Sequence, residues 1–175
     1  MKRFLLIFFY YFLSSLCFSQ EGEVVDGIKN KLKKYTANDS VKAELIIDLA
    51  WEYSFYDYRN SIKQCDNAIS LSKSINYESG VATALSIKGN SYRTLIIYDS
   101  AYYFLNQALQ IRKKQGRKNK IAAVTQNLAN VYYQEGKMAE AITRYKEAIK
   151  ASEEAGDQKS VLIAITNLAS VYRTI

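Results

Sequence analysis

The chain has 175 residues, of which 49% are apolar and 23% charged, an ordinary globular balance for one domain. Proline is absent and glycine counts 7, so helices meet few breakers and the composition favours an all-α fold. The absence of histidine removes the commonest general base and the commonest zinc ligand. The net charge is +7 and falls by two, to +5, once Lys2 and Arg3 are removed with a leader. This modest excess does not require a nucleic-acid partner.

The first nineteen residues have the layout of a signal peptide. A basic start precedes an apolar stretch over residues 4–18, which is shorter than the roughly 20 residues that span a membrane. Small side chains at Cys17 and Ser19 predict cleavage after Ser19. We therefore expect an exported protein, periplasmic or secreted, with no stable membrane span in the mature chain. Lipidation of Cys17 is the alternative, but Leu16 stands where lipoprotein signals favour a small residue.

Residues 20–42 are predicted to form an N-terminal capping helix and a linker. Val24, Ile28 and Leu32 follow one another at intervals of four, which is helical spacing within residues 23–35. Asp39 and Ser40 are typical residues for the start of the next helix.

A repeat of 40 residues governs the rest of the chain. The motif Asn-Leu-Ala-Asn-Val-Tyr at 127–132 recurs as Asn-Leu-Ala-Ser-Val-Tyr at 167–172, and residues 88–92 precede the first of these by the same offset. Residues 49–53 lie 39 before their counterparts, which indicates one residue fewer in the internal turn of the first unit. The expected units are 43–81, 82–121 and 122–161, with a partial unit at 162–175.

Each unit contains two stretches with apolar residues at helical spacing, joined by a short turn. Gly136 is typical of a residue just past a helix end, and Asp99 of the N-cap of a following helix. The units are therefore predicted to be helical hairpins, with second helices lengthened to account for the period.

The third unit resembles the tetratricopeptide repeat family. The resemblance rests on a Leu-small pair and a tyrosine in the first helix, glycine in the turn, and alanines flanking an aromatic residue in the second. These are Leu128, Ala129, Tyr132, Gly136, Ala141, Tyr145 and Ala148. The family's closing proline is missing, and the period exceeds the usual 34 or so. The resemblance covers residues 43–175 and implies a right-handed superhelical solenoid of antiparallel helix hairpins.

The same resemblance implies a protein-interaction scaffold that binds a peptide or protein and catalyses nothing. Forty-residue versions resemble extracytoplasmic sensor regions of bacterial signalling proteins. The alternative function is therefore a sensory input segment of a longer histidine kinase or helix-turn-helix regulator.

In the family, polar residues of the first helices line a concave groove and hold an extended peptide. Asparagine amides both donate and accept hydrogen bonds, which suits a peptide main chain, and arginine suits a carboxylate. Ordinary solvated helix surface is the alternative interpretation. The lysines by which some relatives clamp a terminal carboxylate are missing here. The candidate groove residues are Ser86, Asn90, Arg93, Gln126, Asn130 and Tyr133.

Other candidate features have structural explanations. Residues 112–120 carry six positive charges and are predicted to be a solvated inter-hairpin turn, with anion binding as the alternative. Cys65 is expected to be a small buried hydrophobe, and no cofactor, metal or catalytic site stands out. Tyrosines at the repeated first-helix position are expected inside. The apolar residues of 161–172 extend beyond one helix face, which predicts self-association or another cover for the C-terminal helix.

Overall fold

The computed structural model describes residues 22–175, so the predicted signal peptide lies outside the described residues. Within this range every regular element is a helix, which confirms the all-α prediction. A helix over residues 22–34 is followed by α2 (Ser40–Tyr53), α3 (Tyr58–Ser74), α4 (Glu78–Thr94), α5 (Tyr98–Lys114), α6 (Lys118–Gln134), α7 (Met138–Glu154) and α8 (Gln158–Thr174).

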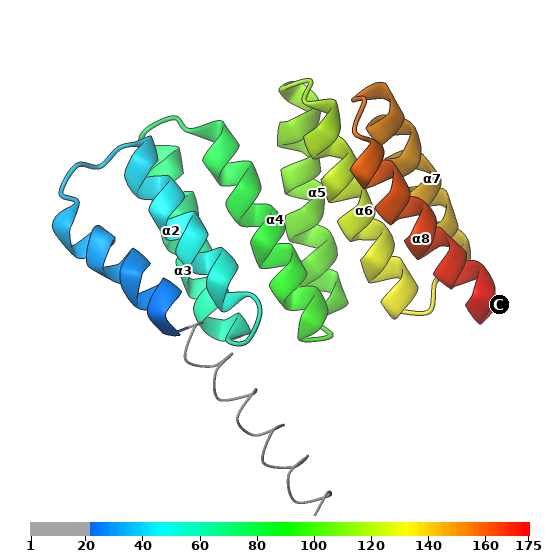
Figure 1. Cartoon of the computed structure of the whole chain (residues 1–175), viewed down its shortest axis with the longest axis horizontal. Coiled ribbons are helices and arrows are strands. Elements are labelled where there is room, and N and C mark those ends of the chain that lie inside the picture. The colour runs from blue at the N-terminus through cyan, green and yellow to red at the C-terminus, as the bar shows by residue number, and fades with distance from the viewer. Residues whose placement is uncertain (1–21) are drawn as a thin grey trace, which may run out of the picture.

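Successive helices pack as antiparallel hairpins that stack side by side, α2 with α3, α4 with α5, and α6 with α7 (Figure 1). The first helices α2, α4, α6 and α8 also contact one another from unit to unit. Among residues 22–175, the second helices α3, α5 and α7 make no such contacts. Because the first helices lie closer together, they form the inner face of the curved stack.

The helices from α3 to α8 are each 17 residues long, and three-residue turns join them. Two such helices with their two turns account for the period of 40. The expected lengthening of the second helices is therefore only part of the explanation, because the first helices α4, α6 and α8 have the same length. Helices α4, α6 and α8 begin at Glu78, Lys118 and Gln158, about four residues before the expected unit boundaries. Their polar first turns carry no apolar periodicity that would have placed them in the helix.

The turns have a repeat of their own, because every twentieth residue from 76 to 156 has a positive φ: Asn76, Ile96, Gly116, Gly136 and Gly156. This left-handed residue closes each of the helices from α3 to α7, as predicted for Gly136. The expected N-cap at Asp99 is wrong. The left-handed turn at Ile96 lets α5 begin at Tyr98, so Asp99 falls in the first helical turn. The prediction for α2 is confirmed, since Asp39 accepts hydrogen bonds from the backbone N–H groups of Val41 and Lys42.

Small residues occupy the places where the helices of a hairpin approach most closely. Ala50 and Ala129 are fully buried, and the corresponding Gly89 lies so near α5 that an added Cβ would stand 2.6 Å from Cγ of Leu105. Cys65 is fully buried, and burial raises the pKa of its thiol to about 12. Its expected role as a buried hydrophobe is confirmed.

The repeated tyrosines are less buried than expected. Tyr53, Tyr92 and Tyr132 are half-buried, while Tyr172 is 50% exposed. Tyr132 is covered by its neighbour Tyr102, whose ring centroid lies 4.7 Å away. Tyr132 also packs against the following helix, α7, whereas no described helix follows α8 to cover Tyr172 in the same way.

Candidate functional site

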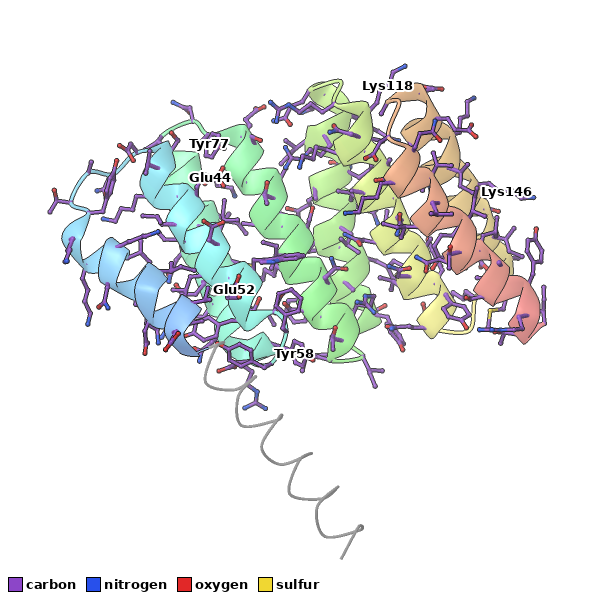
Figure 2. All side chains as sticks on the ribbon, viewed as in Figure 1. Glu44, Glu52, Tyr58, Tyr77, Lys118 and Lys146 are labelled. Carbon is purple, nitrogen blue, oxygen red and sulfur yellow. The ribbon has the colours of Figure 1, made fainter. Side chains whose placement is uncertain are left out.

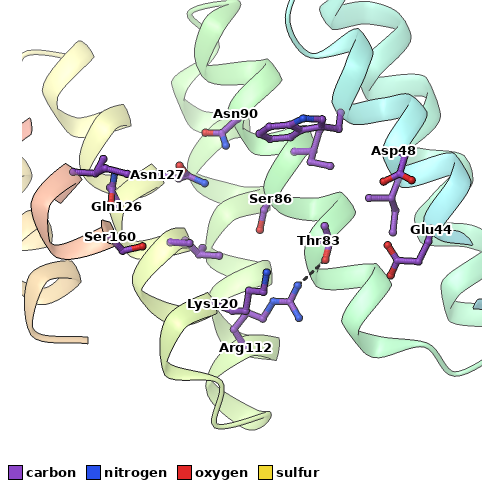
Figure 3. Close-up of a pocket in the computed structure, with 16 residues that line it drawn as sticks. Glu44, Asp48, Thr83, Ser86, Asn90, Arg112, Lys120, Gln126, Asn127 and Ser160 are labelled. Atoms are coloured by element: carbon purple, nitrogen blue, oxygen red, sulfur yellow. Dashed lines mark hydrogen bonds between the residues drawn. The ribbon is translucent and has the colours of Figure 1, made fainter. Parts of the chain in front are cut away.

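A hollow of about 580 Å³ lies on the inner face of the stack and is shown in Figure 3. We call it the first hollow. Its walls come from all four first helices, with one side chain added from the end of α5. The residues that line it are Glu44, Ile47, Asp48, Trp51, Thr83, Ser86, Ile87, Asn90, Arg112, Lys120, Ala123, Val124, Gln126, Asn127, Ser160 and Ile163.

The middle of the first hollow combines apolar surface with amide groups. Ile87 and Val124 are buried beside it, whereas Trp51 remains half exposed. The Oδ1 atom of Asn90 is buried without a hydrogen-bond partner in the described part of the chain. A buried polar atom without a partner is costly, so this amide is the clearest unfilled hydrogen-bonding position on the inner face.

Charged side chains stand on opposite sides of the first hollow (Figure 3). Glu44 and Asp48 project from α2, and Arg112 and Lys120 project from the α5 and α6 side. Partial desolvation raises the pKa of Asp48, Glu44 raises it further, and Lys31 opposes the shift. The first hollow therefore has negative side chains on its α2 wall and positive side chains on the wall formed by α5 and α6.

Arg112 is held in place by hydrogen bonds to α4. Its guanidinium donates to Oγ of Ser79 at 2.9 Å and to Oγ1 of Thr83 at 2.7 Å, and it also donates to Gln115 within its own turn. Burial lowers the pKa of Arg112, and Arg117 lowers it further. Since most of its N–H groups are used within the protein, the main role of Arg112 is to link α5 to α4 through hydrogen bonds.

A second hollow of about 380 Å³ lies further along the first helices, towards their C-terminal ends. Its lining is almost entirely polar and includes two arginines but no carboxylate. The residues that line the second hollow are Arg93, Asn130, Tyr133, Gln134, Tyr145, Asn167, Ser170 and Arg173.

Arg93 is the most unusual side chain of the second hollow. It is half-buried, and its Nε is buried without a partner among residues 22–175. Burial lowers the pKa of Arg93, and the nearby groups that oppose this shift are tyrosine hydroxyls rather than carboxylates. A guanidinium in this position offers its fork of N–H donors to a ligand.

Asn130 is oriented by its neighbour. The hydroxyl of the buried Tyr145 donates to Oδ1 of Asn130 at 2.5 Å, which leaves the amide nitrogen to face elsewhere. Burial raises the pKa of Tyr145 to about 12, so its hydroxyl remains a donor at ordinary pH. The second hollow is consequently rich in donors.

The structure divides the six predicted groove residues between the two hollows. Ser86, Asn90 and Gln126 line the first, and Arg93, Asn130 and Tyr133 line the second. Sequence reasoning missed the charged and aromatic lining residues. The 40-residue repeat could have found Arg173, which follows the candidate Tyr133 by one period, and also the polar Ser170, which follows the candidate Asn130. The others missed are Glu44, Asp48, Trp51, Arg112 and Lys120.

The basic run at 112–120 is not uniformly solvated. Arg112 is 3% exposed, contrary to the expectation of a surface loop, because Ser79 and Thr83 supply acceptors from another helix. Lys118 forms an ion pair of 2.9 Å with Glu154. Residues 22–175 contain no cluster of three or more potential metal-ligating Cys, Asp or Glu side chains, and none of their helices is long and apolar enough to cross a bilayer.

Residues 120–175 match the family model of the tetratricopeptide repeat. No curated protein matches the sequence. Solved structures of the same fold include a Rap protein complexed with competence and sporulation factor, which is 23% identical with a TM-score of 0.77. This match covers 94% of the chain and 47% of the Rap protein.

Two further structures support the same fold. Aspartyl phosphate phosphatase F from Bacillus subtilis is 16% identical with a TM-score of 0.78, and the match covers 87% of this chain and 43% of that one. A signal-transduction ATPase with a tetratricopeptide repeat sensor, from Pyrococcus horikoshii, is 20% identical with a TM-score of 0.69, over 82% and 23% of the respective chains. This chain spans less than half the length of each of these proteins.

The fold and the family match together define the class. Residues 120–175 match the tetratricopeptide-repeat family model, and the hairpins before them have the same solenoid fold as the repeat proteins of the solved structures. Such arrays are generally protein-binding scaffolds rather than enzymes.

Proposed function

We propose that the chain binds an extended peptide segment of a partner along its inner face, across the first and second hollows. Among the described residues, four side chains have a buried polar atom without a partner, and the observation that carries the proposal is that two of them, Asn90 through Oδ1 and Arg93 through Nε, each line one of the hollows. A peptide main chain supplies donors and acceptors at regular intervals and can satisfy both. The Rap protein of the same fold is described in complex with competence and sporulation factor, which supports a binding role.

The protein's role is binding without catalysis. The polar residues of the two hollows are mostly amides, hydroxyls and guanidinium groups, and the described range holds one cysteine, whose thiol is buried. Neither hollow therefore offers an activated nucleophile beside a general base, the arrangement on which most hydrolytic mechanisms depend.

The proposed setting is outside the cytoplasm, on the strength of the signal-peptide layout of the first nineteen residues. The mature protein then begins at Gln20. N-terminal sequencing of exported protein tests this proposal, which fails if the isolated chain begins at Met1 or carries a lipid on Cys17.

A sensory input segment is the second candidate function. The ATPase from Pyrococcus horikoshii carries a tetratricopeptide repeat sensor of the same fold, and this chain spans part of that protein's length. In this case peptide binding on the inner face supplies the signal. A coding sequence that continues into a kinase or DNA-binding domain favours this candidate over a free-standing scaffold.

Capture of peptides on the immobilised protein tests the binding proposal. The probe is a pool of random hexapeptides with free termini, read out by mass spectrometry. We expect Asn90→Ala combined with Gln126→Ala to reduce retention severalfold, at a cost of roughly 1–2 kcal/mol, because both side chains face the first hollow and can pair with a peptide main chain. The matched control is Asn106→Ala on the exposed surface of α5. Equal retention by both variants and by the parent refutes a peptide site on the inner face.

A further inference from the structure

We propose that the inner face also sets the direction of the bound peptide. Its carboxylate end lies in the second hollow between Arg93 and Arg173, and its amino or basic end lies against Glu44 and Asp48 of α2. This inference rests on the peptide-binding function proposed above and adds to it the ligand's charge pattern and orientation.

The acidic end of the groove is α2. Glu44, Asp48 and Glu52 follow one another at intervals of four, so they share one side of the helix. Glu44 and Glu52 are labelled in Figure 2, and Asp48 in Figure 3. The first two line the first hollow. Lys31, from the helix over residues 22–34, is the cation that opposes the charge of Asp48, and Tyr77 donates a hydrogen bond to Glu44. Arg112, across the first hollow, also interacts with Glu44, but on α2 itself the three carboxylates outnumber the one lysine, Lys42, so the α2 wall carries a net negative charge.

The opposite end of the groove has the opposite charge. Helices α6 and α8 contain no aspartate or glutamate, while they contain Lys118, Lys120, Lys159 and Arg173. Lys118 is neutralised by Glu154 of α7, but Lys120 lines the first hollow on the α6 side. The charge of the inner face thus changes sign between α2 and the helices α6 and α8.

The second hollow is suited to a carboxylate. Arg93 and Arg173 occupy equivalent positions two repeats apart, and both line this hollow. Neither arginine has an ion pair in the described range. The amide nitrogen of Asn130 adds donors, because Tyr145 already occupies its oxygen. A carboxylate accepts several hydrogen bonds at once and pairs with guanidinium groups in a two-point geometry.

The carboxylate has two possible sources on a peptide, its C-terminus or an acidic side chain. Both sources present a carboxylate to Arg93 and Arg173. We therefore predict the charge pattern of the bound peptide, and the experiment below identifies the source of its carboxylate. In either case the peptide's amino end, or a basic side chain near it, extends over α4 towards the carboxylates of α2. Reversal of the peptide would place like charges together at both ends, which is unfavourable.

Photo-crosslinking gives the direction. The probes are two random hexapeptide pools that carry benzoylphenylalanine at the first or at the last position, each made with a free or an amidated C-terminus. We expect the first-position label to attach to α2 or α4 and the last-position label to α8 or the end of α6. The reverse pattern, or equal labelling of both ends by both pools, overturns the inference.

Charge substitutions test the same inference by affinity. Arg93→Gln with Arg173→Gln is expected to reduce retention of the free-carboxylate pool about tenfold, and Arg59→Gln on the outer helix α3 is the matched control. Asn130→Asp is expected to have a similar effect, because it keeps the acceptor for Tyr145 and removes the donors. An amidated pool that lacks Asp and Glu should bind the parent and the double variant alike.

The outcomes separate the two proposals. If no pool is retained by the parent protein, both the binding function and its direction are refuted. If the pools bind but the arginine substitutions leave the preference for carboxylate unchanged, peptide binding stands and the direction fails. If amidation alone abolishes the preference, the C-terminus supplies the carboxylate. If amidated pools containing Asp and Glu retain the preference, an acidic side chain supplies it.

Discussion

Ile96 is in the turn between α4 and α5, at a position where the later turns have glycine. Its φ of 63° is in the left-handed region, which a β-branched side chain adopts at a cost of about 1–2 kcal/mol. The side chain is 71% exposed, so little packing offsets this cost. We predict that Ile96→Gly raises the free energy of unfolding by about 0.5–1 kcal/mol in urea titrations, after the entropy of glycine is deducted.

The reverse substitution provides the control. Gly136 has a φ of 83°, and a Cβ added there would meet nothing within 4 Å, so Gly136→Ile introduces backbone strain without a clash at the Cβ. It should destabilise the protein. A neutral result for both substitutions contradicts the strain attributed to this turn position.

Gly89 is required by close packing rather than by backbone conformation. An added methyl group meets Leu105, which is fully buried between α4 and its neighbours. Gly89→Ala is therefore expected to lower the free energy of unfolding by about 1–3 kcal/mol, despite the better helix propensity of alanine. The control is Gly27→Ala, where nothing lies within 4 Å and helix propensity should dominate. Denaturant unfolding of both variants measures the difference, and equal effects refute the packing argument.

The start of α2 makes stability depend on pH. The hydroxyl of Tyr35 and the backbone N–H of Lys42 hold the pKa of Asp39 below its ordinary value. Because the pKa of Asp39 is lower in the folded chain than in the unfolded chain, its ionised carboxylate stabilises the fold at pH values above the unfolded-state pKa of about 4. This contribution is lost as the pH falls from that value through the folded-state pKa. Asp39→Asn keeps an acceptor for the cap but cannot titrate, so the loss of stability between pH 6 and pH 3 should become smaller.

Thermal unfolding at several pH values measures this dependence. Asp99→Asn is the control, because Asp99 lies in the first turn of α5 and makes no capping hydrogen bond. If Asp39→Asn leaves the pH dependence of the melting temperature unchanged, the cap does not contribute as described.

The outer side of α8 exposes an apolar stripe. Leu162, Ile165, Ala169 and Tyr172 are exposed, although their equivalents in α6, one repeat earlier, are buried or half-buried. In α6 these positions pack against α7, and α8 has no corresponding helix in the structure. We predict that the 175-residue chain self-associates through this stripe. Leu162→Lys with Ile165→Lys should shift it towards monomer in light scattering, whereas Thr166→Lys should not. A monomeric parent refutes this prediction.

Much of the whole molecule could be predicted from the sequence because its period is constant over most of the array. The spacing places Asn90 and Asn130 on equivalent turns of first helices, and both line the inner face. The separation into two hollows could not be predicted, since it depends on how successive hairpins stack. The burial of Arg112 depends on acceptors from Ser79 and Thr83, which lie more than twenty residues away in sequence. The spacing of Glu44, Asp48 and Glu52 is visible in the sequence. That the first two line the first hollow could not be predicted, because it depends on how α2 packs beside α4.

The most direct test of the account is which face of the stack touches peptide. Benzoylphenylalanine can replace Gln126, which lines the first hollow, or Lys146, which is exposed on the outer helix α7 (Figure 2). Irradiation with the random hexapeptide pool, followed by mass spectrometry of the protein, measures the attachment at each site. We expect peptide adducts at position 126 and few at position 146. Equal labelling of the two sites, or labelling at 146 alone, would contradict binding on the inner face.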